Sequence, residues 1–108
     1  MLAETSKGSV ARIFAARQGF AAWARAQRSD IIANADRAAK GDAEARRALH
    51  ALAHRLHGTS GTLSFDALVE PARQLEVATR AEADCDGIAL AAARLTDQLT
   101  ALKLVIGS

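Results

Sequence analysis

Three histidines, His50, His54 and His57, lie within one stretch whose apolar residues recur with the period of an α-helix. Imidazole is a side chain suited to nucleophilic and metal chemistry near neutral pH. At about 100° per residue, one narrow sector of this helix is apolar and must be buried. The members of this apolar stripe are Leu49, Leu52, Ala53, Leu56, Ser60 and Leu63. His54 falls outside the stripe and shares a face with Arg47, His50, His57, Gly58 and Gly61. The pattern predicts a solvent-facing imidazole on a rigid helix.

Two glycines, Gly58 and Gly61, follow His54 along its own face. Glycine inside a helix costs about 0.5–1 kcal/mol relative to alanine, so the pair needs a compensating reason. Room for an approaching partner is one such reason. A fraying helix end is the alternative. Leu63 argues against fraying, because it continues the apolar stripe beyond both glycines.

The segment from His54 to Leu63 resembles the signature of histidine-containing phosphotransfer (HPt) domains, which relay phosphoryl groups in two-component signalling. The positions that match in register are His54, Leu56, His57, Gly58, Ser60 and Leu63. The likeness extends over residues 20–104. Two positions depart from it, since His57 replaces the usual lysine and Ser64 replaces the usual glycine, before Phe65.

The resemblance implies that His54 accepts a phosphoryl group from the phospho-aspartate of a receiver domain and passes it to another receiver aspartate. An imidazole with a pKa near ~6.5 is largely neutral at pH 7 and needs no dedicated base. The family's chemistry implies that the receiver supplies Mg²⁺, so we expect no cofactor on this chain. The sequence has no glycine-rich phosphate loop, which favours a phosphoryl carrier over an ATP-using kinase.

Several residues are candidates for supporting roles at this site. His57, Arg47 and His50 would add positive charge or hydrogen bonds, with Ser60 and the two glycines beside them. Because histidine titrates near neutral pH, His57 in place of lysine predicts transfer rates that fall as pH rises. Gln27, level with His54 on the preceding antiparallel helix, is expected either to hydrogen-bond its imidazole or to lie at a solvated edge.

Partner docking is expected to use apolar area beside the histidine. Ile32 and Phe65 fall outside their helical stripes, and Arg28 adds charge near Ile32. Each apolar residue could equally belong to a wide core seam, and Arg28 to the solvated surface. The expected partners are receiver domains of response regulators or hybrid histidine kinases.

Two other classes of function compete with phosphotransfer. His50, His54 and His57 have spacing that could converge on zinc from one helix, although three ligands on a single helix give poor tetrahedral geometry. No cysteine or acidic ligand lies nearby in the sequence. A bundle that only binds a partner helix or RNA, without phosphorylation, is the second alternative.

The elements that must position these residues are helices. Much of the 50% hydrophobic content is alanine, aromatic residues make up 4%, and tyrosine is absent, which favours helices over sheet. We expect a break near Gly19 and a long helix over 20–38, although Ser29-Asp30 offers an alternative restart. Lys40-Gly41-Asp42 predicts a stop and a new N-cap before a helix over 43–63.

A fourth helix is expected after Phe65-Asp66, with Pro71 tolerable only near its first turn. Its stripe is Leu68, Ala72, Leu75 and Thr79. Asp84-Cys85-Asp86-Gly87 predicts a turn, and the last helix has the stripe Ile88, Leu95, Leu99, Leu102 and Ile106. Short connections favour an all-α, antiparallel, up-down-up-down four-helix bundle with an additional N-terminal helical segment. Residues 1–108 form one domain, with a bundle core over about 20–106.

The bulk charge narrows the class of partner. A net charge of +2 is compatible with acidic protein surfaces but lacks the dense basic clusters of a nucleic-acid binder. No apolar run approaches the ~18–20 residues that a membrane span needs. The single Cys85 excludes an internal disulfide and fits a reducing compartment. We therefore expect a cytoplasmic monomer without membrane or nucleic-acid partners.

Overall fold

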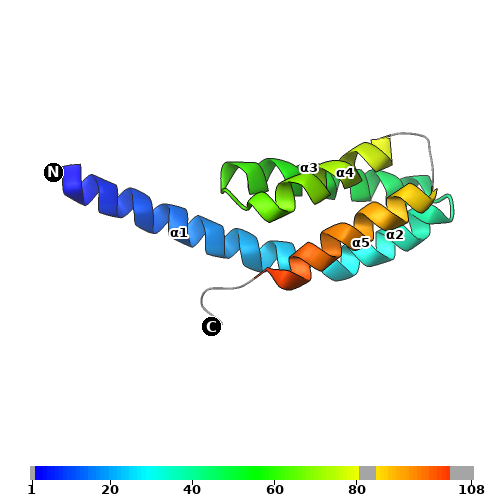
Figure 1. The fold of residues 1–108 in the computed structure, drawn as a ribbon, viewed down its shortest axis with the longest axis horizontal. Coiled ribbons are helices and arrows are strands. Elements are labelled where there is room, and N and C mark those ends of the chain that lie inside the picture. The colour runs from blue at the N-terminus through cyan, green and yellow to red at the C-terminus, as the bar shows by residue number, and fades with distance from the viewer. Residues whose placement is uncertain (1, 81–84, 103–108) are drawn as a thin grey trace.

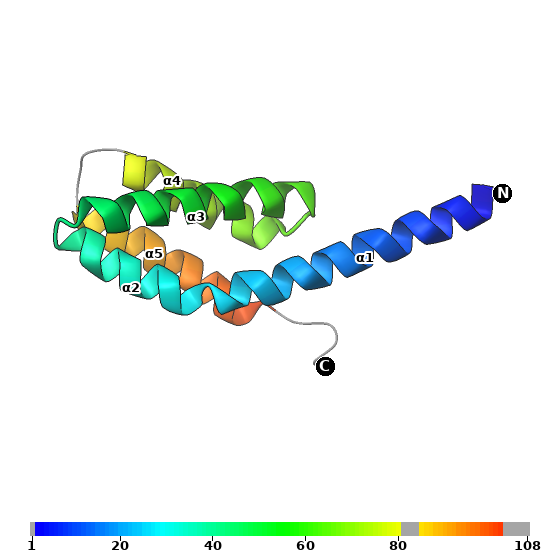
Figure 2. The same cartoon turned by 180° about the vertical axis from the view of Figure 1, so that it is seen from behind.

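Five α-helices make up the regular structure in the computed structural model, which describes residues 2–80 and 85–102. They are α1 (Leu2–Ala26), α2 (Arg28–Ala39), α3 (Ala43–Thr62), α4 (Asp66–Arg80) and α5 (Cys85–Ala101). The last four pack in a ring, in which each helix contacts the next and α5 closes against α2. α3 and α4 lie side by side across the bundle from α2 and α5 (Figures 1 and 2). The all-α prediction is confirmed.

The first helix differs from the sequence prediction. α1 runs without interruption through Gly19, and the break comes at Gln27, between Ala26 and Arg28. There the Gln27 amide N–H bonds to the carbonyl of Ala24, three residues back, at 3.0 Å. The predicted break near Gly19 is wrong because glycine weakens a helix by only about 1 kcal/mol, and good helix formers surround it. The alternative restart at Ser29-Asp30 lies one or two residues after the true start of α2 at Arg28.

Side chains satisfy the carbonyls that the break releases. The Gln27 side-chain amide donates to the carbonyl of Trp23 at 3.2 Å. The Arg28 guanidinium donates to the carbonyl of Arg25 at 3.0 Å. Because unpaired carbonyls at a helix end are costly when shielded from water, these two bonds stabilise the change of direction.

The N-terminal part of α1 extends beyond the bundle (Figures 1 and 2). Aromatic side chains attach its C-terminal half to the other helices. The rings of Phe20 and Phe65 lie 5.3 Å apart, and the Arg17 guanidinium lies 4.6 Å from the centre of the Phe65 ring. Arg55 of α3 stacks on Trp23 at 4.2 Å. These contacts join α1 to α3 and to the α3–α4 turn.

The turn before α3 forms as its residues predict. Gly41 has φ +97°, a left-handed conformation that favours glycine. Asp42 is the N-cap of α3, and its carboxylate accepts a hydrogen bond from the amide of Ala45 at 3.0 Å. α3 ends at Thr62, one residue before the predicted end, and its cap residue is Leu63.

The core follows the predicted stripes. Leu49, Leu56 and Leu75 are completely buried, and burial of such a side chain stabilises the fold by about 1.5–3 kcal/mol. The other fully enclosed large residues are Ile31, Leu68, Ile88, Leu95 and Leu99. Leu52 of α3 and the cap residue Leu63 are only half-buried at the margin of the stripe. The pattern of each helix therefore identifies the side that faces its neighbours.

Two predictions about α4 and α5 need adjustment. Pro71 is in the second turn of α4, not the first, and the helix continues through it although proline removes one backbone donor. α5 begins at Cys85, so Cys85, Asp86 and Gly87 are helical where a turn was predicted. Asp84 and Ile106 lie outside the described residues.

Within residues 2–80 and 85–102, no helical stretch combines the length and the hydrophobicity that a bilayer crossing requires.

Candidate functional site

His54 projects from α3 on the side that faces α4, and 73% of its side chain is exposed. The neighbours that set this position are Ala53 and Leu56, both fully buried on the core side of the helix. The helical period therefore turns His54 away from the core, as predicted. A partner molecule in solvent can therefore reach the His54 ring.

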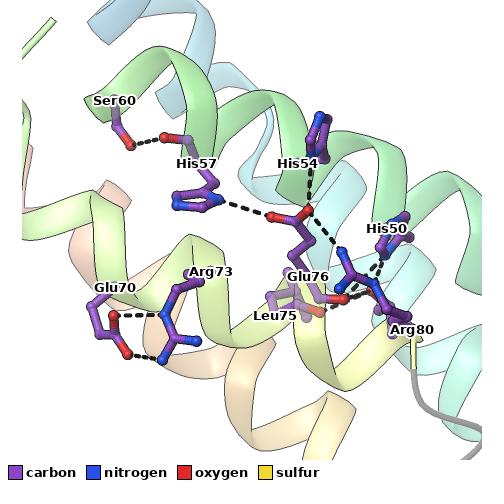
Figure 3. Close-up of polar contacts among 10 residues, drawn as sticks. His50, His54, His57, Ser60, Glu70, Arg73, Leu75, Glu76 and Arg80 are labelled. Carbon is purple, nitrogen blue, oxygen red and sulfur yellow. Dashed lines mark hydrogen bonds and ion pairs between the residues drawn. The ribbon is translucent and has the colours of Figure 1, made fainter. Parts of the chain in front are cut away.

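A buried carboxylate is hydrogen-bonded to the His54 ring. Glu76 of α4 has a side chain only 8% exposed, and its Oε2 accepts a hydrogen bond from Nδ1 of His54 at 2.7 Å. Its other oxygen, Oε1, accepts from Nδ1 of His57 at 2.9 Å. Figure 3 shows the two imidazoles turned toward this one carboxylate from successive turns of α3. Arg80 adds a third donor, with Nη2 3.4 Å from Oε2.

The charge state of Glu76 decides which nitrogen of His54 can react. The hydrogen bond from His54 lowers the pKa of Glu76 against the opposing effect of burial, and the bond from His57 lowers it further. The ionised carboxylate can only accept, so a neutral His54 has its proton on Nδ1 and its lone pair on Nε2. Nε2 has no hydrogen bond within the described residues and faces outward. The site thus presents one nucleophilic nitrogen to solvent.

His50 anchors the same pair of helices. Its Nδ1–H is shared between the carbonyl of Glu76 at 3.1 Å and the hydroxyl of Thr79 at 3.0 Å. The Thr79 hydroxyl in turn donates to the carbonyl of Leu75 at 2.9 Å. His50 therefore fixes the backbone of α4 beside Glu76.

Gly58 and Gly61 leave open space beside His54. Both Gly58 and Gly61 are exposed, and a Cβ built on either would meet no atom within 4 Å. The packing of the chain itself therefore does not require glycine at either position. Their small size is relevant only to something that approaches from outside.

Some predicted supporting residues lie elsewhere. Of the two roles expected for Gln27, the bond to His54 is not formed: the half-buried Gln27 side chain donates to the carbonyl of Trp23, and Glu76 bonds the His54 imidazole instead. The axial level of Gln27 was inferred from the turn length, which does not fix the side of α3 on which His54 lies. Ser60 is completely buried, and its hydroxyl donates to the carbonyl of His57 at 3.1 Å, so it cannot meet a ligand at the surface. Arg47 is exposed on α3.

The predicted docking residues fall into two places. Arg28 and Ile32 line a surface depression of about 460 Å³ between α2 and α5, and Arg28 donates to the hydroxyl of Thr100 at 3.3 Å. Because the α2–α5 side lies across the ring from α3 and α4, these two residues are not beside His54. Phe65 is half-buried in the contact with Arg17 and Phe20, so it serves mainly to attach α1.

The metal alternative finds no matching arrangement. Among residues 2–80 and 85–102, no three His, Cys, Asp or Glu side chains are placed to hold a metal ion together. The Nδ1 atoms of His54 and His57 are both bonded to Glu76, and that of His50 is bonded to Glu76 and Thr79.

Sequence reasoning missed Glu76 and Arg80. A signal for Glu76 was present, because it follows Ala72 by four residues and precedes Thr79 by three, which places an acidic residue at the edge of a buried stripe. A buried charge requires partners, and the histidine face of α3 supplies two of them, with Arg80 of α4 as a third.

Comparison with known proteins agrees with this geometry. The family model described as Hpt domain matches residues 16–104. No curated protein and no solved structure matches the chain. The matched span contains the whole helical ring together with His54, His57 and Glu76. The chain belongs to the Hpt domain family.

Proposed function

We propose that this protein is a histidine phosphotransfer protein of a two-component phosphorelay. Nε2 of His54 accepts a phosphoryl group from the phospho-aspartate of one receiver domain and passes it to the aspartate of another. The observation that carries the proposal is the exposed His54 ring whose Nδ1 is bonded to a buried carboxylate. That arrangement orients the ring and leaves the reactive lone pair in solvent.

The transfer step needs little from this chain beyond position and charge. The lone pair of Nε2 forms a bond to phosphorus while the bond from phosphorus to the aspartyl oxygen breaks, and the leaving group is the receiver's carboxylate. The ring keeps its Nδ1 proton and becomes cationic. Glu76, 2.7 Å from that nitrogen, offsets the new charge. The reverse sequence returns the phosphoryl group to a second receiver.

The surroundings of His54 suit a large partner. Because Gly58 and Gly61 add no side chain to this face, the receiver's active site can reach Nε2 without displacing part of the bundle. Mg²⁺ would be held by the receiver, and this chain would carry phosphate without binding a cofactor or ATP. The proposed partners are receiver domains of response regulators or hybrid kinases.

The scaffold we propose is an antiparallel, up-down-up-down four-helix bundle that acts as a monomer in the cytoplasm. The three-residue turn between α2 and α3 and the ring of helix contacts support this topology. The single cysteine, Cys85, is exposed and unpaired, which fits a reducing compartment.

The experiment incubates the protein with phosphorylated receiver domains and looks for acid-labile, base-stable label. We expect label on His54, located by mass spectrometry, and none in His54→Gln with its helix content intact. The matched control is His50→Asn, which keeps a donor near the position of Nδ1 and should retain label. Label that persists in His54→Gln would refute the choice of acceptor. A complete absence of label across a panel of receivers would favour a bundle that only binds.

A further inference from the structure

His57 presents the same nitrogen to the same carboxylate as His54 does. We propose that His57 is a positioning residue that acts through Glu76, and that its protonation reduces the negative charge that Glu76 offers to His54. This inference rests on the proposed function. Protonation of His57 would lower the rate of phosphoryl transfer in mild acid, for a reason separate from the titration of His54 itself.

The His57 ring is directed toward Glu76. Its Nδ1 lies 2.9 Å from Oε1 of Glu76, and 35% of its side chain is exposed, half the fraction of His54. Figure 3 shows the ring between α3 and α4 with Nδ1 turned to Glu76. Since the carboxylate only accepts, neutral His57 has its proton on Nδ1 and a lone pair on Nε2. In that form it has no proton to donate to a phosphoryl oxygen.

The hydrogen bond from His57 to Oε1 restrains the carboxylate of Glu76. A carboxylate on a flexible side chain can rotate, and the donor on Oε1 restrains that rotation. With His57 on one oxygen, the other oxygen is directed to Nδ1 of His54. His57 thus orients Glu76, and Glu76 orients the ring that reacts.

Titratable and charged groups surround His57. The groups that face it are His54 on its own helix and two acidic residues of α4, Glu70 and Glu76. Arg73 already pairs with Glu70, and Arg80 lies 3.4 Å from Oε2 of Glu76. The charge of His57 contributes to lowering the pKa of both Glu70 and Glu76. A protonated His57 would therefore compete with His54 and Arg80 for the negative charge of Glu76.

Protonation of His57 is expected to slow phosphoryl transfer. Transfer makes the His54 ring cationic, and Glu76 is the one acidic residue hydrogen-bonded to it in residues 2–80 and 85–102. When His57 is also protonated, two imidazolium rings share one carboxylate, and each weakens the other's interaction with it. A positive charge at position 57 acting directly on the phosphoryl group would instead assist transfer as pH falls. The two roles of His57 predict opposite pH dependence.

The experiment compares the wild-type protein with His57→Asn. The asparagine amide can donate to Oε1 from about the position of Nδ1 and does not titrate. The measured quantity is the ratio of the wild-type transfer rate to the variant rate, with each rate first divided by the fraction of neutral His54 that ¹⁵N NMR gives for that protein at the same pH. We expect a ratio near one at about pH 8.5 that falls to about one third at about pH 6.

A second measurement needs no transfer at all. In the unphosphorylated proteins, ¹⁵N NMR of the imidazole rings follows each histidine through its titration. His57→Asn should move the titration midpoint of His54 to higher pH, because a competing cation has gone. Circular dichroism confirms that the variant remains folded.

The outcomes separate the two proposals. A ratio that rises as pH falls, or a His54 titration that is unchanged in His57→Asn, overturns the role of His57 while normal labelling keeps the phosphotransfer function. A protein that takes no label from any receiver refutes the function, and the role of His57 with it.

Discussion

Glu76→Gln tests the central feature of the site, a charged acceptor beneath the reactive imidazole. The substitution keeps the length and shape of the side chain and removes its charge. Glutamine has one acceptor oxygen, whereas Glu76 accepts from His54, His57 and Arg80. The new amide group would therefore face at least one donor that it cannot satisfy.

The size of the effect can be worked from these contacts. A hydrogen bond to a charged group contributes about 1.5–3 kcal/mol and a neutral one about 0.5–1.5 kcal/mol. The difference is about 1 kcal/mol once the exposure of His54, 73% of its side chain, is allowed for. That loss corresponds to transfer about fivefold slower. The unsatisfied donor should lower the free energy of unfolding by about 1–2 kcal/mol.

The assay is the initial rate of phosphoryl transfer from a phosphorylated receiver domain, with urea denaturation to measure stability. Asp36→Asn is the matched control, because Asp36 is an exposed carboxylate on α2 whose partner, Lys40, lies 3.1 Å away. Its loss should change stability by less than about 0.5 kcal/mol and leave transfer unchanged. A Glu76→Gln protein that is folded and transfers at the wild-type rate would show that the carboxylate does not support the reaction.

Four further substitutions and one pH series test other parts of the structure. Gly58→Leu should leave the bundle folded but slow transfer at least about tenfold by blocking approach, whereas Gly58→Ala should raise stability by about 0.5–1 kcal/mol; unchanged rates in Gly58→Leu would remove the clearance argument. Asp42→Ala should cost about 1 kcal/mol in urea denaturation through loss of the α3 N-cap, with transfer unaffected. Gly19→Ala should raise the helix content and thermal stability of α1, by about 0.5–1 kcal/mol, since the helix is continuous there; a loss of helix would favour a break at that glycine. Finally, because the folded pKa of Glu76 is lowered, its stabilisation is complete above the unfolded value of about 4.3 and disappears as pH falls through the folded one. The free energies of unfolding of wild type and Glu76→Gln should therefore draw closer together as pH falls below the unfolded pKa of Glu76.

Local signals explain what the sequence predicts well. The stop at Lys40-Gly41-Asp42 depends on conformations of a few adjacent residues, and the exposure of His54 depends on the 3.6-residue period of one helix. Neither requires knowledge of a neighbouring element. Both predictions are confirmed by the structure.

The break at Gln27 shows where local signals are insufficient. Gly19 is the weakest helix former between Val10 and Ala26, yet the helix continues through it. The chain turns where α1 leaves the bundle and α2 joins it, and that place is fixed by packing of whole helices. Gln27 and Arg28 can then supply donors to the released carbonyls, which lowers the cost of the turn at that position.

The partner of His54 is Glu76 and not Gln27, for a geometric reason. Counting residues back through a turn gives the height of His54 along the helix axis, and Gln27 does lie at the start of the adjoining helix, as the N-cap of α2. Height alone does not say whether His54 points toward α2 or toward α4. The rotation of α3 in the bundle decides that, and it is set by the burial of Leu49, Ala53 and Leu56 among all four helices. The acidic residue within the stripe of α4 is the one sequence feature that carries this information, because a buried carboxylate must meet donors. An ionisable residue at the edge of a buried stripe therefore identifies which face of a neighbouring helix it meets, and here it selects the face with the histidines.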